Sequence, residues 1–434
     1  MSLLARLTNG VRYWRVHGSR VFLWEVWRRL RSRGRALRLP VVTATAPSGL
    51  LPLARELVRT RFTACEPLPT TVATAPAGPR VSMVTDSINA GSLFGGVGTA
   101  MILAALLAQR RQARLRIITR RDRAHADNLD AILALYGIVT AGDVEFVFAP
   151  PGTRRPIEVA RDELFLTTSW WTTAATLGGV SADQILYLLQ EDERMFYPLG
   201  DDHLQCSRVL ADPRLRLAVN TSLLLQHLDA TGIPGLAARA LAFEPAFPAS
   251  VYRRRAPAQT GAKRRLLFYA RPSHLRNLFH FGLEVLDQAV TRGIVDLARW
   301  DIELVGLHIP PLRFDNGYVP LRHEGLGWQA YAELVGHTDL GLSLMYTPHP
   351  SYPPLDLAAS GAVAVTNRFG NKTTLERYCT NILCADLDLE AMLQAMRAGI
   401  VLAEDDTERA RRHAANRLAT DWPQTLAPIL DRFA

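Results

Sequence analysis

Two arginines five residues apart stand where a strand of a β-sheet should end. Arg271 follows the apolar run 266–269, and Arg276 comes at the start of the next helical pattern. Guanidinium groups form forked, charge-assisted hydrogen bonds with phosphate oxygens, and they would meet the charge that a departing diphosphate gains. The spacing therefore predicts a diphosphate site, with a pair of solvated arginines as the alternative.

A carboxylate marks a second segment that could bind a nucleotide. Pro353 and Pro354 are typical of a helix start. Asp356 falls in the first turn of the apolar helix that we expect over residues 355–359. A carboxylate in this place can accept hydrogen bonds from two ribose hydroxyls. A favourable interaction with the helix dipole would explain the same residue more simply.

Two glycines, Gly95 and Gly96, occupy a turn between an expected strand at 81–85 and an apolar helix. Glycine lets the backbone approach a ligand closely, and a helix N-terminus presents free N–H groups to an anion. The segment matches neither the dinucleotide fingerprint nor the Walker A motif. It predicts a contact to the diphosphate or to an acceptor hydroxyl, and a plain tight turn is the alternative.

Polar and aromatic side chains follow two further expected strands. Asn367 and Lys372 leave the strand 363–366, and they could donate hydrogen bonds to phosphate or sugar oxygens. Trp170 and Trp171 follow the strand at 164–168. Indole rings stack on sugars, so the tryptophan pair is a candidate acceptor site. Core packing is the favoured interpretation for at least one of the two.

These residues depend on strands that alternate with helical patterns in two successive regions. In residues 80–255 we expect strands at 81–85, 115–119, 144–148, 164–168, 185–189 and 215–219. In residues 256–415 we expect them at 266–269, 302–305, 340–344, 363–366 and 382–384. Such alternation predicts an α/β protein with two Rossmann-like, doubly wound domains facing a cleft, whose ligands lie outside the carboxyl ends of the strands.

The two ends of the chain extend beyond these domains. Residues 1–79 predict a basic extension that could form a helix, followed by a Pro-rich linker. Residues 416–434 predict a helix that returns to the N-terminal domain. The boundary between the domains is expected in the polar segment 251–263.

The chain of 434 residues has a formal net charge of +9, and much of the excess lies in one segment. Residues 12–38 hold nine arginines and one acid, Glu25. Arginine mixed with tryptophan in residues 10–38 predicts either an amphipathic element on an anionic membrane surface or a basic helix packed on its own domain. Nucleic-acid-binding motifs are absent.

Cysteine use and hydropathy bear on compartment and metal content. Four scattered cysteines are typical of a reducing cytosol, and none has zinc-site spacing. No signal peptide is visible, and the longest apolar run, 98–108, is too short to span a bilayer and predicts a buried helix. We therefore expect a cytoplasmic protein without a bound metal or cofactor, either free or peripheral on the inner face of the membrane.

Taken together in this order, the motifs resemble a known family. The arginine pair and the run Asp356–Gly361 are similar to motifs of retaining GT-B glycosyltransferases of the glycogen-synthase-like group. More specifically, the chain resembles the WsaF-type rhamnosyltransferases of rhamnan and S-layer glycan assembly. The segments concerned are FGG at 94–96, YLLQEDE at 187–193, FYP at 196–198, YARP at 269–272, RNLF at 276–279, SYPP at 351–354 and VTN at 365–367.

The resemblance implies roles for individual residues. Arg271, Arg276 and the adjoining Asn277 would bind the diphosphate of the sugar donor, and Asp356 would hold the ribose in place of the group's Glu. Ser351 and Tyr352 would line the sugar-donor pocket. The group's Glu-x7-Glu signature fails, because Pro348 stands eight residues before Asp356. The contact to a sugar hydroxyl is therefore missing or supplied by His349.

The resemblance also implies a position near the reaction centre for Glu191, where it could act as a catalytic base. A helix cap or a salt-bridged carboxylate beside Asp192 and Glu193 is the alternative.

The resemblance implies transfer of a sugar, with rhamnose from dTDP-rhamnose as the best candidate, to a growing cell-surface polysaccharide or S-layer-type glycan. It implies a metal-independent reaction that retains configuration at the sugar. A non-catalytic, membrane-associated partner of a polysaccharide assembly complex is an alternative. A nucleotide-dependent oxidoreductase is a weaker one, because the glycine fingerprint is absent.

Overall fold

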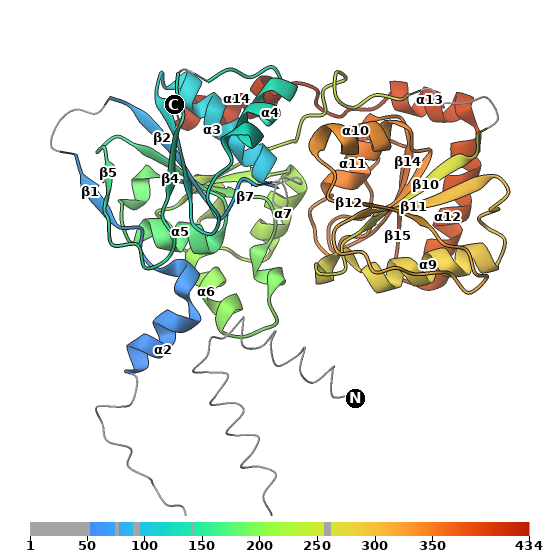
Figure 1. Ribbon diagram of the computed structural model, residues 1–434, viewed down its shortest axis with the longest axis horizontal. Coiled ribbons are helices and arrows are strands. Elements are labelled where there is room, and N and C mark those ends of the chain that lie inside the picture. Colours follow the sequence, from blue (N-terminus) through green and yellow to red (C-terminus); the bar gives the residue numbers. More distant parts are fainter. Residues whose placement is uncertain (1–52, 74–77, 90–95, 141, 256–261, 434) are drawn as a thin grey trace, which may run out of the picture. The chain divides into compact units, whose positions relative to one another are not determined.

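The computed structural model describes residues 53–73, 78–89, 96–140, 142–255 and 262–433. The basic segment 10–38 therefore lies outside the described residues, as do Gly95 and residues 256–261 of the expected domain boundary. The described chain contains two large parallel sheets, one formed before residue 244 and one after residue 263 (Figure 1).

The first sheet has seven strands in the order β4-β3-β2-β6-β7-β8-β9, and every pairing is parallel. Its strands are β2 (Arg80–Thr85), β3 (Arg114–Thr119), β4 (Glu145–Phe148), β6 (Leu164–Thr167), β7 (Ile185–Leu189), β8 (Arg216–Asn220) and β9 (Ala240–Phe243). Its helices are α3 (Gly98–Arg110), α4 (Ala126–Leu135), α5 (Trp170–Leu177), α6 (Asp201–Leu210), α7 (Ser222–Ala230) and α8 (Leu236–Arg239).

Helix α3 forms the centre of one face of this sheet. All of its residues from Gly98 to Ala108 are buried, which confirms the buried helix expected there. Its side chains pack with Val81 and Met83 of β2. Because both faces of β2 are covered, all six of its residues are buried, as is usual for strands of parallel sheets.

The second sheet has six parallel strands in the order β12-β11-β10-β13-β14-β15. They are β10 (Arg264–Ala270), β11 (Trp300–Gly306), β12 (Leu321–Glu324), β13 (Leu340–Leu342), β14 (Val363–Asn367) and β15 (Ile382–Ala385). The helices are α9 (Phe279–Thr291), α10 (Trp328–Gly336), α11 (Tyr352–Ala359), α12 (Leu389–Glu404) and α13 (Asp406–Ala414).

Helices cover both faces of the second sheet (Figure 1). Leu266 and Phe268 of β10 point toward α9 and α12, whereas Leu267 between them packs in the cluster of α10 and α11. The alternation follows from the two-residue period of a strand. Gly306 permits close pairing at the end of β11, because a Cβ atom there would lie 1.7 Å from the carbonyl oxygen of Ala270.

The last helix, α14 (Trp422–Phe433), packs on helix α3 and strand β9 of the first domain. Trp422 and Leu426 are buried in the same apolar cluster as α3. A salt bridge of 2.7 Å joins Arg110 of α3 to Asp431. The chain therefore passes from the first sheet to the second and back again.

The expected fold is confirmed. Each of the eleven expected strands is present, with ends that shift by at most two residues. Four short strands had not been expected: β9, β12, β1 (Thr70–Val72) and β5 (Ile157–Val159). The last two pair with each other, so part of the segment expected to be a linker is instead attached to the first domain. Leu68, just before β1, is buried.

Before β1 the chain forms α2 (Ala54–Arg61) and the short 3-10 helix η2 (Thr63–Cys65). Among the described residues, no helix is long and apolar enough to cross a bilayer. In the same part of the chain, no group of three or more His, Cys, Asp or Glu side chains is arranged to hold a metal ion.

Candidate active site

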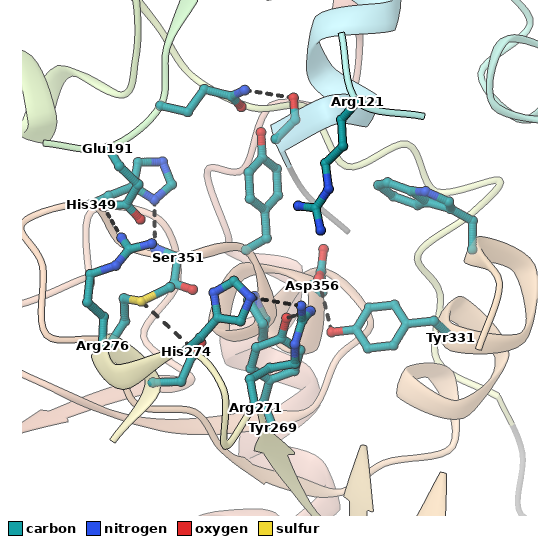
Figure 2. Close-up of a pocket in the computed structure, with 17 residues that line it drawn as sticks. Arg121, Glu191, Tyr269, Arg271, His274, Arg276, Tyr331, His349, Ser351 and Asp356 are labelled. Atoms are coloured by element: carbon teal, nitrogen blue, oxygen red, sulfur yellow. Dashed lines mark hydrogen bonds and ion pairs between the residues drawn. The ribbon is translucent and has the colours of Figure 1, made fainter. Parts of the chain in front are cut away.

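A cavity of about 450 Å³ lies at the carboxyl ends of strands from both sheets. In the second sheet it opens beside β10, where the strand order reverses between β10 and β13. Ligands of open α/β sheets bind at such switch points. Nine residues expected from sequence line the cavity: Gly96, Glu191, Arg271, Arg276, Asn277, His349, Ser351, Tyr352 and Asp356 (Figure 2).

Arg271 leaves the end of β10 and is 8% exposed. Its guanidinium lies 3.3 Å from the Tyr269 hydroxyl and 3.1 Å from Nε2 of His274. Burial and the two neighbouring arginines lower the pKa of His274 to about 4, so this imidazole is neutral near pH 7. His274 therefore faces Arg271 at the cavity wall as a neutral hydrogen-bond partner.

Arg276 lies in a short 3-10 helix, η7 (Leu275–Asn277), and not at the start of the following α-helix as expected. Leu278 has a left-handed backbone conformation, with φ of 48°, which separates η7 from α9. The guanidinium of Arg276 lies 4.1 Å from the centre of the Phe196 ring and 3.4 Å from the Glu191 carboxylate. Both of these partners belong to the first domain, so Arg276 spans the two sides of the cavity.

Three successive acids after β7 have three different environments. Asp192 pairs with Arg194 and His227, and these hydrogen bonds outweigh burial and lower its pKa to about 2. Glu193 accepts a hydrogen bond from the backbone N–H of Trp170 at the start of α5, and burial raises its pKa to about 8. Only Glu191 of the three lines the cavity.

Glu191 is held from the second domain. The Thr347 hydroxyl donates a hydrogen bond to its carboxylate, and Arg276 forms the ion pair described above. Burial raises the pKa of Glu191, and the charge of Arg276 opposes that rise. The carboxylate therefore lies beside two polar side chains of the second domain.

Asp356 lies in the second turn of its helix and not in the first, because α11 begins at Tyr352, three residues earlier than expected. Its carboxylate accepts a hydrogen bond of 3.2 Å from the Tyr331 hydroxyl. Burial raises its pKa to about 7. The helix dipole is thus a poor explanation for this carboxylate, since the effect is confined to the first turn.

His349 is 2% exposed and has a defined tautomer. Its Nδ1 accepts a hydrogen bond of 3.0 Å from the backbone N–H of Ser351, so a neutral ring has its proton on Nε2. Burial and the charge of Lys372 lower the pKa of His349 to about 3. Ser351 itself has φ of 69°, which turns the chain into α11. His349 can therefore donate, but not accept, one further hydrogen bond.

The side chain of Tyr352, in the second domain, contacts the first domain. Its hydroxyl lies 2.5 Å from Thr99 Oγ1 of α3 and 2.8 Å from Asn220 Nδ2 at the end of β8. Asn220 also bonds to Gln190, whose amide donates to the carbonyl oxygen of Gly96 over 2.6 Å. Gly96 and the start of α11 thus belong to one polar network.

Asn277, Asn367 and Lys372 support the loop that carries His349. Asn277, which lines the cavity, and Asn367 both contact Met345 at the start of this loop. Lys372 is 0% exposed, and its ammonium donates to the carbonyl oxygens of Met345 and His349 over 3.2 and 3.4 Å. Asn367 and Lys372 therefore lie behind the loop, and not at the cavity wall where direct donor contacts were expected.

The two tryptophans differ. Trp170 is 3% exposed and donates a hydrogen bond to the Tyr197 hydroxyl, so it packs in the core. Trp171 is partly buried and donates to Asp86 over 3.0 Å. Neither residue lines the cavity, and an acceptor role for Trp171 stays a prediction.

Sequence patterns did not single out several residues that line the cavity. Arg121 enters from the loop after β3 and faces the same space as Arg271 and Asp356 (Figure 2). Trp328 and Tyr331 come from α10. The only signal for Arg121 was its place after a strand end, and α10 showed none, because aromatic residues on an apolar helix are usually core residues.

Comparison with known proteins identifies the family of this chain. The model of the WsaF N-terminal domain matches residues 80–221, and that of the WsaF C-terminal domain matches residues 264–397. Together they cover more than half of the chain. The chain belongs to the WsaF family. It has the two-domain GT-B fold, and its cavity lies between the two matched domains.

One curated relative and several solved structures are similar to this WsaF-family chain. An O-antigen biosynthesis protein, RfbC of Myxococcus xanthus, is 28% identical over 386 residues, which span 83% of this chain but only 28% of the relative. The fold resembles that of Anabaena HepE in complex with UDP-glucose, with 13% identity, a TM-score of 0.53, and coverage of 82% of this chain and 98% of HepE.

A second solved structure, WaaG, a glycosyltransferase involved in lipopolysaccharide biosynthesis, has a TM-score of 0.55 and 13% identity. The match covers 82% of this chain and 99% of WaaG.

Proposed function

We propose that this chain transfers a sugar from a nucleotide diphospho-sugar to a growing cell-surface polysaccharide or S-layer-type glycan. Rhamnose from dTDP-rhamnose is the donor that we favour, as the sequence resemblance implies. One observation supports the proposal above all: Arg271, Arg276 and Asp356 line a single cavity at the switch point of the second sheet.

The polar side chains of the cavity suit the polar parts of such a donor. Arg271 and Arg276 offer forked donors to the diphosphate, whose negative charge grows as the bond to the sugar breaks. Asp356, one turn into α11, can accept hydrogen bonds from ribose hydroxyls. The Nε2–H group of His349 is left to donate to an oxygen of the sugar or of the diphosphate.

Metal independence and retention of configuration are part of this proposal. Two guanidinium groups supply positive charge where a metal ion would otherwise neutralise the leaving diphosphate. Glu191 is the acid nearest to this charge, at 3.4 Å from Arg276. A carboxylate in that position could accept the proton of the attacking hydroxyl, and it is the candidate catalytic base.

The relatives support a nucleotide-sugar donor and a glycan product. HepE binds UDP and UDP-glucose at the same fold, and RfbC is named for O-antigen biosynthesis. The acceptor in our proposal is the end of a glycan, either free or linked to a lipid. The basic segment 10–38 would hold the enzyme on the anionic inner face of the membrane, as a peripheral cytoplasmic protein.

A thermal-shift panel of dTDP-, UDP- and GDP-sugars tests the proposal. A donor at 100 times its dissociation constant should add about 2.7 kcal/mol of stability. We expect dTDP-rhamnose to stabilise the protein, and Arg271→Ala to abolish the effect. Arg299→Ala is the matched control, because Arg299 pairs with Glu404 away from the cavity.

Each outcome of that panel has a defined meaning. Stabilisation by another nucleotide sugar would replace rhamnose and keep the transferase. A response to none of them, with no transfer to water or glycan, would favour a non-catalytic partner of a polysaccharide assembly complex.

A further inference from the structure

The first sheet has its own switch point, which the sugar-donor site does not use. Strand β2 has β3 on one side and β6 on the other, so the chain direction across the sheet reverses between β2 and β6. Asp86 directly follows β2, and Trp171 lies in the first turn of α5, just after β6. Open α/β sheets bind ligands outside the carboxyl ends of strands at such a point.

Asp86 and Trp171 form a fixed pair there. The indole Nε1–H donates a hydrogen bond of 3.0 Å to Oδ2 of Asp86. The carbonyl oxygen of Asp86 accepts hydrogen bonds from the backbone N–H groups of Arg121 and Asp122, at 2.9 and 3.2 Å. The side chain therefore has little freedom, because both its head and its backbone are held.

In each residue of the pair, one group could contact a ligand: the second carboxylate oxygen of Asp86 and the ring of Trp171. Oδ1 of Asp86 is not occupied by Trp171, and both residues are partly exposed. The rings of Trp171 and Trp170 pack at an interplanar angle of 88°, with ring centres 5.9 Å apart, which fixes the plane of the Trp171 indole ring. A carboxylate oxygen beside a rigid indole ring suits a sugar, because it can accept a hydroxyl hydrogen bond while the ring contacts C–H groups.

We propose that Asp86 and Trp171 form the subsite for the acceptor sugar. The ligand is a neutral glycosyl residue with a free hydroxyl for Oδ1 of Asp86. Arg121, which is adjacent to the pair and lines the sugar-donor cavity, marks the side on which the two substrates meet (Figure 2). The inference rests on the proposed function only in taking the acceptor to be a glycan.

We favour an uncharged ligand because the Asp86 carboxylate would lie directly against it. Burial raises the pKa of Asp86, whereas the hydrogen bond from Trp171 and the charges of Arg121 and Arg120 lower it. An acceptor phosphate would meet the carboxylate directly and be repelled by it. A hydroxyl is attracted to the same oxygen without bringing a second negative charge.

Direct binding of octyl α-rhamnoside and octyl β-glucoside to the full chain tests the subsite without any sugar donor. Saturation-transfer NMR should show contact between at least one glycoside and the wild-type protein. Asp86→Asn should weaken that binding at least tenfold, and Trp171→Ala should do the same. Asp122→Asn is the matched control, because Asp122 is the exposed neighbouring carboxylate whose backbone N–H bonds to the same carbonyl.

A kinetic experiment then separates this inference from the proposed function. With a sugar donor that the protein hydrolyses, Asp86→Asn should raise KM for the glycoside at least tenfold and leave the rate of transfer to water within twofold. Trp171→Phe, which keeps a ring but loses the N–H donor, is the second variant in case Asp86→Asn does not fold.

The proposed subsite is wrong if neither glycoside binds the wild-type protein at a concentration of about 10 mM. It is also wrong if the folded Asp86 and Trp171 variants bind the glycoside with the same affinity as the control variant. Absence of any hydrolysable sugar donor would overturn the proposed function instead, and the NMR result would still decide the subsite.

Discussion

The guanidinium of Arg276 lies 3.4 Å from the carboxylate of Glu191, and the two residues belong to different domains. The diphosphate expected at Arg276 carries the same charge sign as Glu191. Both anions would therefore compete for one cation, or share it. In either case, the position of Glu191 depends on whether the sugar donor is present.

Glu191→Gln tests both consequences of this pairing. Removal of the competing charge should strengthen binding of the sugar donor several-fold. Loss of a general base should lower kcat by about 100-fold or more. Steady-state kinetics and calorimetry of sugar-donor binding measure the two effects separately. An unchanged kcat would remove Glu191 from the reaction. Thr347→Val, which deletes the hydrogen bond to Glu191 and the one that the Thr347 hydroxyl accepts from the backbone N–H of His349, is the control for its position.

Arg271→Ala should lower kcat/KM by about 100- to 1000-fold, the usual effect of removing one hydrogen-bond donor from a developing charge. Arg271→Lys should recover only part of this loss, because an ammonium group cannot form the forked pair. Transfer assays at saturating acceptor measure the effect. Equal rates in Arg271→Ala and in the control Arg299→Ala would show that Arg271 does not contact the leaving group.

The fold was predictable because its strands are continuous apolar runs buried on both faces. Strand β2 reads RVSMVT with every residue buried, and its sequence alone identifies it. Strand β12 reads LRHE and lies at the edge of the second sheet, where one side of the strand has no neighbour. Polar residues are acceptable there, and no apolar pattern distinguishes the strand from a loop.

The site was predictable where a residue type and a strand end coincided. Arg271 follows β10, and position alone places its side chain at the cavity. Lys372 also follows a strand, yet its ammonium bonds backward to two carbonyl groups of the adjoining loop. Side-chain direction after a turn depends on tertiary contacts that the local sequence does not contain. For the same reason the sequence did not predict the contact of Tyr331, which donates a hydrogen bond to Asp356 from a separate helix.

Stability should depend on pH through Asp356. Burial raises its pKa to about 7 from an ordinary value of 3.8. Between these two pH values the folded carboxyl keeps a proton that the unfolded chain loses. The free energy of unfolding should therefore fall as pH rises through this window, by up to about 1.4 kcal/mol for each pH unit. Urea unfolding at pH 5 and pH 8 measures the change.

Asp356→Asn should remove that contribution and leave the variant more stable than the wild type at pH 8. Other buried acids, such as Glu193, titrate in both proteins and cancel in the comparison. The variant should at the same time bind the sugar donor at least tenfold more weakly, since an ionised carboxylate forms the stronger hydrogen bonds with hydroxyls. Identical pH slopes in the two proteins would contradict the assignment to Asp356.

Tyr352→Phe should weaken the link between the two domains. The lost hydroxyl bonds to Thr99 and to the amide of Asn220, at 2.5 and 2.8 Å, and all three side chains are mostly buried. Phenylalanine fills the same space but leaves one N–H group of Asn220 without this acceptor, so the free energy of unfolding should fall by about 1–2 kcal/mol. Urea unfolding measures it, with Tyr346→Phe as the control, because Tyr346 is 48% exposed. Equal losses in the two variants would mean that the Tyr352 hydroxyl does not hold the domains together, and that the apolar contacts of α14 with α3 do so instead.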